Sequence, residues 1–359
     1  MSPPQTPQYP FSAVIGQSKL KTALLLAASD PSLGGVLISG NRGIAKSTLA
    51  RSLADLLDGR SFVNCPLGVS EDRLLGSLDI EHALANGGLK FSAGLFAQAH
   101  GGVLYVDEIN LLPDHLVDLL LDVSASGVNY VERDGISHQH EAQFVLIGSM
   151  NPEEGALRPQ LLDRFGLSIE IHENPDLEQR MAIVESRLAF DNDPLDFCEQ
   201  YAERQSATRQ LVRHANQTLK QVKASSESKL DIAKRCMQAG VEGVRADLAL
   251  FRAARAHAAI RGGKNILEED INAVTDLVLA HRQQAESHQN PAEKPSASKP
   301  QENNDSTPPQ GSQTADSEQQ AAQGDWGEMP VEDVAMGLSR HLDPDKFSNN
   351  MSLVQKKKH

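Results

Sequence analysis

The sequence predicts an α/β fold, a parallel sheet covered by helices, followed by a smaller helical domain and a disordered acidic tail. From Phe11 to about Ile171, short β-like runs alternate with helical patterns, as expected for such a sheet. From Leu177 to about Arg282, strand signals vanish and apolar residues recur at helical spacing. After Arg282, Gln, Ser, Pro, Glu and Asn dominate, and this composition cannot offset the entropy of ordering the chain.

Composition limits the class of protein. With 359 residues, of which 40% are apolar, the chain can hold two folded domains. Aromatic residues make up only 4%, so the cores must consist mainly of Leu, Ile, Val and Ala. The net charge of -14 argues against a protein that wraps nucleic acid, because phosphate contacts need clustered Lys and Arg. Part of this charge is local, since residues 283–330 hold eight acids and two lysines.

The cysteines and the N-terminus indicate a cytosolic protein. Cys65, Cys198 and Cys236 lie far apart and lack the paired spacing of a zinc site or redox pair. Residues 1–10 contain Pro and Gln where a secretory signal has a basic start and an apolar stretch. No apolar run approaches the ~20 residues of a membrane span. We therefore expect reduced thiols and no membrane association.

Three apolar strands are predicted with polar residues at their ends: Gly35–Ser39, Gly102–Asp107 and Phe144–Met150. In an open α/β sheet a nucleotide binds at the carboxyl ends of the strands, so these ends mark the candidate site. The stretch Asn129–Gln143 alternates around an Asp-Gly pair and predicts a protruding β-hairpin before the third strand.

A phosphate-binding loop follows the first of these strands and precedes an amphipathic helical pattern. A Gly-rich turn at a helix N-terminus points backbone N–H groups at phosphates. Lys46 is expected to reach the β- and γ-phosphates, and Ser47 to ligate the Mg²⁺ of Mg-ATP. Ala45 stands where the usual pattern has Gly. The predicted loop consists of Gly40, Asn41, Arg42, Gly43, Ile44, Ala45, Lys46, Ser47 and Thr48.

Two adjacent acids end the second strand, about sixty residues after the phosphate loop, which is Walker B spacing. Asp107 is predicted to hold the Mg²⁺ shell. Glu108 is predicted to orient and deprotonate the attacking water, because neighbouring acids at a strand end can take separate roles. Together with the loop, these residues predict an NTPase that uses ATP and Mg²⁺.

Further polar residues follow the third strand. Asn151 is positioned to contact the water or the γ-phosphate, or else simply to cap the turn. Of two later arginines, Arg164 is the better candidate for a residue that a neighbouring subunit supplies to the transferred phosphoryl group. A surface salt bridge is the alternative for either arginine, and for Arg158 it is at least as plausible. Arg245 opens a helix of the second domain and is expected to sense the γ-phosphate from the same subunit.

With these motifs in order, the chain resembles the AAA+ ATPase subunit of magnesium chelatase, the I subunit, and its relatives in cobalt chelation. The resemblance covers roughly Tyr9 to Arg282. Its most specific stretches, beyond the nucleotide motifs, are Phe11–Gln17, Leu104–Leu112, Asp114–Val123, Asn151–Gly155 and Leu157–Gly166.

The resemblance implies an AAA+ P-loop NTPase with a helical lid and assigns roles to the site residues. Asn151 becomes sensor 1, Arg164 the arginine finger and Arg245 the sensor-2 arginine. It also implies a ring, usually of six subunits, an integrin-like (VWA) D-type partner and a separate large subunit that inserts a divalent metal into a tetrapyrrole. The inserted metal, magnesium or cobalt, stays open.

The expected organisation has four parts. Residues 1–175 form the AAA+ nucleotide-binding domain, 176–282 the lid, 283–324 a disordered acidic linker and 325–359 a short C-terminal segment. An apolar island at Trp326–Leu338 is too small to fold alone and is either a docking peptide or a remnant.

Two other functions stay open at this point. The first is a MoxR-like AAA+ chaperone that works with an integrin-like partner, because its nucleotide motifs would be the same. The second is a non-hydrolysing D-type scaffold subunit. A scaffold has no physical need for the full set of nucleotide-binding and catalytic residues, which argues against it.

Overall fold

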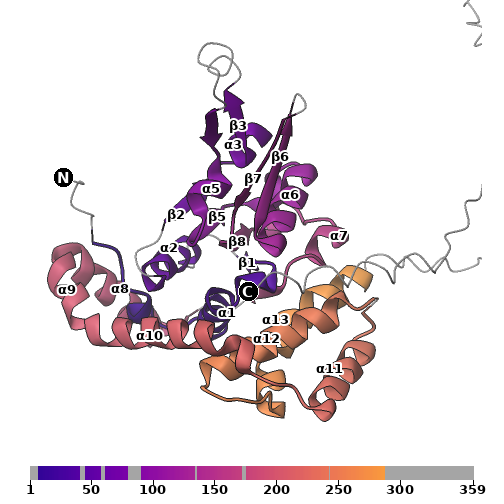
Figure 1. Cartoon of the computed structure of the whole chain (residues 1–359). Coiled ribbons are helices and arrows are strands. Elements are labelled where there is room, and N and C mark those ends of the chain that lie inside the picture. Colours follow the sequence, from indigo (N-terminus) through magenta and orange to yellow (C-terminus); the bar gives the residue numbers. More distant parts are fainter. Residues whose placement is uncertain are drawn as a thin grey trace, which may run out of the picture. The chain divides into compact units, whose positions relative to one another are not determined.

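The computed structural model describes residues 7–40, 45–57, 61–79, 90–133, 136–171, 175–241 and 243–287. Its described elements belong to one compact unit within Met1–Lys294 (Figure 1). The linker was predicted to begin at residue 283, but helix α13 (Glu268–Ser287) continues to Ser287, so the helical part extends past the predicted boundary. The rest of the predicted linker and the predicted docking peptide lie outside the described residues, as do Asn41, Arg42, Gly43 and Ile44 of the phosphate loop.

A five-stranded parallel sheet forms the centre of this unit, with strand order β2-β5-β8-β1-β9. The three predicted strands are confirmed as β1, β5 and β8. The strands of this sheet are β1 (Val36–Gly40), β2 (Phe62–Cys65), β5 (Val103–Val106), β8 (Val145–Met150) and β9 (Leu167–Ile171).

Helices cover both faces of the sheet, and the side chains of each strand alternate between them. On one face, Val36 and Ile38 pack with α1 (Ser18–Ser29) and α2 (Lys46–Leu56). On the other face, Leu37 packs in a cluster with the remaining helices of the α/β part. These are α3 (Glu71–Leu75), α5 (Leu95–Ala99), α6 (Asp114–Ser126) and α7 (Pro159–Leu162).

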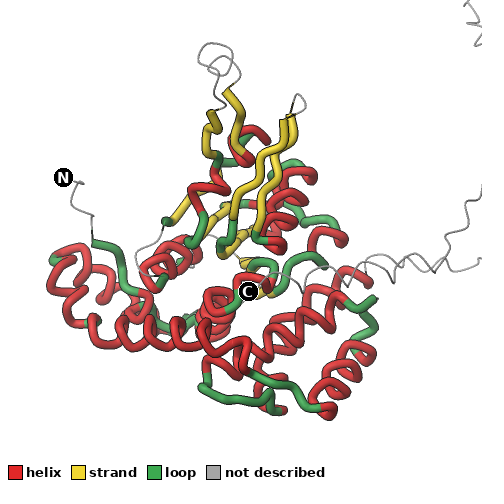
Figure 2. Tube along the Cα trace, viewed as in Figure 1, coloured by secondary structure: helices red, strands yellow, loops and turns green. Residues whose placement is uncertain are grey.

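Two antiparallel hairpins extend from the same part of the fold (Figure 2). The predicted hairpin is confirmed as β6 (Val128–Arg133) and β7 (Ile136–Glu141). A second hairpin, β3 (Gly76–Asp79) with β4 (Lys90–Ala93), was not predicted. Short 3-10 turns complete the α/β part at Phe11–Ala13, Pro31–Leu33, Ile109–Leu111 and Pro152–Glu154.

The second half of the described chain is helical, as predicted. Its helices are α8 (Leu177–Asn192), α9 (Pro194–Gln200), α10 (Ala202–Thr218), α11 (Ser226–Gln238), α12 (Arg245–Ile260) and α13 (Glu268–Ser287), with a 3-10 turn at Leu219–Gln221. Asp176 caps α8 by accepting from the Gln179 N–H at 2.8 Å, which explains its start.

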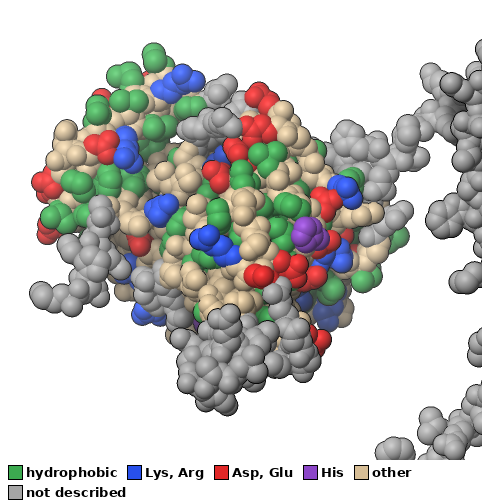
Figure 3. Space-filling model, turned by 90° about the horizontal axis from the view of Figure 1, so that it is seen from above, with side chains coloured by type: hydrophobic (Ala, Val, Ile, Leu, Met, Phe, Trp, Pro, Cys, Tyr) green, Lys and Arg blue, Asp and Glu red, His purple; other side chains and the backbone are tan. Residues whose placement is uncertain are grey.

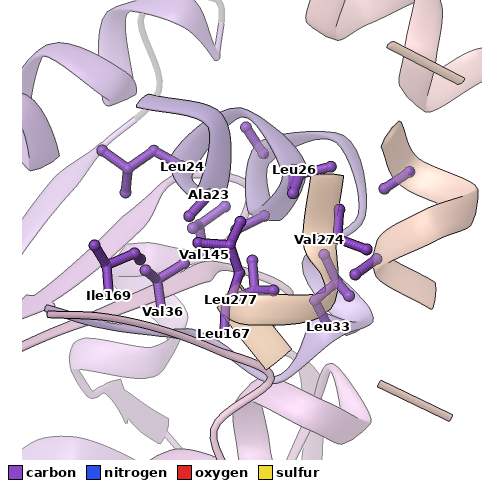
Figure 4. Packing of buried hydrophobic residues seen from close by; sticks show 14 of the residues in the cluster. Ala23, Leu24, Leu26, Leu33, Val36, Val145, Leu167, Ile169, Val274 and Leu277 are labelled. Atoms are coloured by element: carbon purple, nitrogen blue, oxygen red, sulfur yellow. The ribbon is translucent and has the colours of Figure 1, made fainter. Parts of the chain in front are cut away.

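The helical part and the sheet share one apolar core. Figure 4 shows Val274 and Leu277 of α13 beside Leu26 of α1 and Leu167 of β9. Polar contacts reinforce this packing, since Arg255 of α12 forms a 3.0 Å ion pair with the buried Asp30 at the end of α1. The position of α12 and α13 is therefore fixed against the sheet.

Candidate active site

The predicted phosphate loop connects β1, which ends at Gly40, to α2, which begins at Lys46. Lys46 opens α2, and its Nζ donates to the carbonyls of Gly40 at 2.6 Å and Met150 at 3.2 Å. The ammonium group therefore lies between the carboxyl ends of β1 and β8. Ala45 has a left-handed backbone with φ 55°, a conformation that costs an L residue about 1 kcal/mol and explains why Gly is usual there. The residue itself is exposed.

Asp107 follows β5 at the same edge of the sheet and is held by two hydroxyl groups. Tyr105 donates to its Oδ1 at 2.9 Å, and Ser149 of β8 donates to the same oxygen. Burial raises the pKa of Tyr105 above its ordinary value, so its hydroxyl keeps the proton that it donates. The Asp107 carboxylate is thus oriented while the residue itself stays exposed.

Glu108 is joined to the same network through its backbone. Its N–H donates to the Ser149 hydroxyl at 3.2 Å, and its φ of 53° is left-handed. Such strain in a non-glycine residue often accompanies a functional position. Ser149 therefore connects both acids, although the sequence assigned it no role. A buried serine within an otherwise apolar strand was the available signal.

Asn151 follows β8 and is nearly buried, with 7% of its surface exposed. Its Oδ1 accepts from the Glu153 N–H at 3.3 Å and caps the turn that follows. The capping role weighed for this residue is therefore real. Asn151 also lies next to the predicted phosphate-binding lysine, because the carbonyl of the preceding Met150 accepts a hydrogen bond from Lys46. The cap is therefore compatible with contact to phosphate.

Arg164 lies against one face of α6, where it pairs with Asp118 and Asp122. These acids are four residues apart and so project from the same side of the helix. One turn earlier, Asp114 pairs with the exposed Arg158 at 2.7 Å. The surface salt bridge considered for Arg158 is confirmed.

Arg164 lies at the amino ends of the strands, whereas the phosphate loop follows the carboxyl end of β1. β9 runs parallel to β1 with Leu167 opposite Val36, and Arg164 precedes the start of β9. The Gly166 N–H donates to the Gly34 carbonyl at 3.4 Å, at the beginning of β1. The full length of β1, about 16 Å for five residues, therefore separates this turn from the loop. Arg164 does not belong to the phosphate site of its own chain.

Arg245, expected to act within the same subunit, lies beside the turn that carries Arg164. Its guanidinium forms a 2.9 Å ion pair with Asp163, the neighbour of Arg164. Helical spacing alone gave no indication of where α12 begins relative to the sheet. The predicted site residues thus fall into two groups, which we call the phosphate half-site (Lys46, Asp107, Glu108 and Asn151) and the arginine half-site (Arg164 and Arg245).

The groups at this edge of the sheet fit Mg-ATP. Ser47 and Asp107 offer the hard oxygen ligands that Mg²⁺ prefers, and both residues are exposed. With Lys46 at the same edge, the set suits a magnesium-bound triphosphate. Elsewhere in the described part of the chain, no group of three or more His, Cys, Asp or Glu residues is arranged to hold a metal. Within the same residues, no helix combines the length and apolar character needed to span a bilayer.

Comparison with known proteins supports an AAA+ fold with a helical lid. A family model for the AAA domain of the dynein-related subfamily matches residues 35–165, and a model for the AAA lid domain matches 229–303. An ATPase-like structure from Cytophaga hutchinsonii, 20% identical with a TM-score of 0.55, covers 77% of this chain and 86% of that one and supports the fold. A structure of the BchI–BchD complex of magnesium chelatase is 43% identical over 77% of this chain and 96% of that one, with a TM-score of 0.47.

Curated relatives are similar over most of the described chain. The magnesium-chelatase 38 kDa subunit of Rhodobacter capsulatus is 44% identical over 77% of this chain and 88% of its own length. Subunit ChlI of Cyanophora paradoxa is 44% identical over 77% and 91%. An uncharacterized protein of Mycobacterium tuberculosis is 49% identical over 76% of this chain, which spans only 44% of that longer relative. The chain belongs to the family of AAA+ ATPase subunits typified by the I subunit of magnesium chelatase.

Proposed function

We propose that this chain is the ATP-hydrolysing motor of a metal chelatase, in which a separate large subunit inserts a divalent metal into a tetrapyrrole. The observation that carries the proposal is the intact nucleotide half-site in a chain 44% identical to chelatase subunits. The metal inserted, Mg²⁺ or Co²⁺, is cargo of the large subunit and need not contact this chain. The proposed compartment is the cytosol.

In the proposed reaction each residue of the half-site has a separate task. Lys46 binds the β- and γ-phosphates, while Ser47 and Asp107 hold the magnesium ion, which neutralises phosphate charge when bound. Glu108 orients the attacking water and accepts its proton. Asn151 fixes the water or the γ-phosphate from the end of β8. Tyr105 and Ser149 keep the Asp107 carboxylate in position through the hydrogen bonds that they donate.

A neighbouring subunit completes this site in the proposal. Arg164 and Arg245 lie at the far edge of the sheet from the loop of their own chain, so they serve the nucleotide of the next subunit. A contact between two different surfaces of one chain is heterologous and closes into a ring when the rotation permits. A ring of six subunits and an integrin-like D-type partner complete the proposed assembly.

The D-type scaffold and the MoxR-like chaperone are less well supported. A scaffold that does not hydrolyse ATP gains nothing from Glu108, and two of the relatives described above are named as chelatase subunits and none as a chaperone.

Metal insertion tests the proposed function directly. Purified chain is combined with a large chelatase subunit, a D-type subunit, ATP and either Mg²⁺ or Co²⁺ with its tetrapyrrole. We expect ATP-dependent insertion, followed by tetrapyrrole absorption, that disappears with the Glu108→Gln variant. Equal insertion by the Glu108→Gln variant and the wild type would contradict the proposal. So would a wild type that inserts neither metal.

A further inference from the structure

Helix α8 carries an apolar stripe that no other described part of the chain covers. The stripe consists of Leu177, Met181, Val184 and Leu188, each between 56% and 75% exposed. Their spacing of four, three and four residues places them on one side of the helix. Figure 3 shows apolar side chains gathered on the lobe at the left, where α8 and α9 lie.

The stripe faces away from the surface that attaches α8 to the protein. At about 100° per residue, Ala182, Ser186 and Phe190 lie on the opposite side of the helix. Phe190 is buried, and Ser186 shares a 2.6 Å hydrogen bond with the Tyr9 hydroxyl. The stripe is therefore not needed for folding, and an exposed apolar surface of this kind marks an interaction site.

A second apolar patch surrounds the turn between α11 and α12. It consists of Met237, Val244 and Leu248, between 53% and 80% exposed. Arg245 directly follows Val244 in the sequence, and its guanidinium forms an ion pair with Asp163. The patch therefore lies next to the turn that carries Arg164.

Each apolar surface accompanies a different half-site. A cavity of about 300 Å³ is lined by Ser47 and Thr48 from the start of α2 and by Arg187 and Phe190 of α8, so α8 flanks the phosphate half-site. The patch at α11–α12 accompanies the arginine half-site. In Figure 1 the two surfaces lie at opposite sides, with α10, about 25 Å long, running between them. They cannot cover each other within one chain.

We propose that the α8 stripe of one subunit receives the α11–α12 patch of the next subunit. The inference rests on the proposed shared nucleotide site, because bringing Arg164 of one chain to the loop of another also brings these two surfaces together. Charge supports the pairing. Glu178 and Glu185 border the stripe on one side, and the exposed Lys234 lies one helical turn before Met237.

Assembly of full-length variants tests this contact. Val184→Glu and Leu248→Lys each place a charge in the apolar contact, and both positions are exposed, so the fold is retained. We expect each single variant to need about tenfold or more protein for half-assembly with a non-hydrolysable ATP analogue, in sedimentation velocity. Gln179→Glu adds the same charge to α8 away from the stripe and should assemble as the wild type.

The double variant identifies the occupant. Every interface of a Val184→Glu/Leu248→Lys ring would set Glu against Lys, so we expect assembly to recover at least in part. Unchanged assembly of both single variants would overturn the inference. So would single variants that fail without recovery in the double variant, the result expected if residues 325–338 or another protein cover α8. Wild-type chain that binds fluorescent ATP but never assembles would instead contradict the proposed shared site.

Discussion

Arg282 of α13 holds the backbone on both sides of Arg164. Its guanidinium donates to the carbonyls of Asp163 at 2.9 Å and Phe165 at 2.7 Å, and to the Asp163 carboxylate at 3.1 Å. Arg282 is 2% exposed, so these bonds form away from water, where an unpaired carbonyl would be costly. The last helix of the lid thereby fixes the turn that carries Arg164.

Removing this guanidinium should loosen that turn. We expect Arg282→Met to lower the free energy of unfolding by about 2–4 kcal/mol, because it leaves buried partners unpaired. Urea unfolding measures the change. The matched control is Arg158→Met, whose exposed pair with Asp114 should contribute no more than about 0.5 kcal/mol. Equal effects of the two variants would contradict the clamp assigned to Arg282.

Glu108 is predicted to act in hydrolysis and not in nucleotide binding. Glu108→Gln keeps the side-chain size but removes the proton acceptor, so we expect ATP turnover to fall about 100-fold or more. The affinity for a fluorescent ATP analogue should stay close to that of the wild type. Glu153→Gln, in the exposed turn after Asn151, is the control and should keep full turnover. A Glu108→Gln variant with wild-type turnover would remove the catalytic assignment.

A shared site predicts recovery of activity in mixed assemblies. Arg164→Ala keeps an intact phosphate half-site, and Glu108→Gln keeps an intact arginine half-site. Each variant alone should be inactive, whereas random mixing in equal amounts restores about a quarter of the interfaces. ATP turnover measured against mixing ratio should therefore pass through a maximum. A flat, inactive profile in mixtures that demonstrably assemble would show that Arg164 does not serve a neighbour.

The sequence predicted the parts of the fold that local patterns encode. Continuous apolar runs identified β1, β5 and β8, which are buried on both faces, and the Asp-Gly pair identified the β6–β7 hairpin. The edge strand β9 was harder to recognise, because Ser168 and Glu170 alternate with its apolar residues. Local patterns also predicted Lys46, Asp107 and Glu108 as site residues.

The position of the lid arginines depends on distant contacts. Arg245 and Asp163 are 82 residues apart in the sequence, and nothing in the spacing of α12 indicates which edge of the sheet it reaches. The same holds for Ser149, whose bond to Asp107 joins two strands whose pairing is set only by the sheet. The positions of Arg245 and Ser149 therefore depend on long-range packing, which local sequence patterns do not encode.

His281, the neighbour of Arg282, predicts how stability depends on pH. Its Nε2 lies 3.3 Å from the Phe165 carbonyl, to which the neutral ring donates. Burial, with a smaller contribution from the Arg282 charge, lowers the pKa of His281 to about 3. The unfolded chain binds this proton near pH 6.5, so the folded state binds fewer protons between the two values. Stability from this residue is complete above about pH 6.5 and is lost as the pH falls.

The expected loss approaches about 1.4 kcal/mol per pH unit below pH 6. Urea unfolding of the wild type and His281→Gln between pH 7 and pH 5 measures it, because other titrating groups cancel in the difference. The wild-type free energy should fall more steeply than that of the variant. His214→Gln, an exposed position on α10, should leave the slope unchanged. If the free energy of unfolding fell equally with pH in the wild type and His281→Gln, the His281 ring would accept a proton in the folded protein. In that case α13 would not exclude water from the turn that carries Arg164.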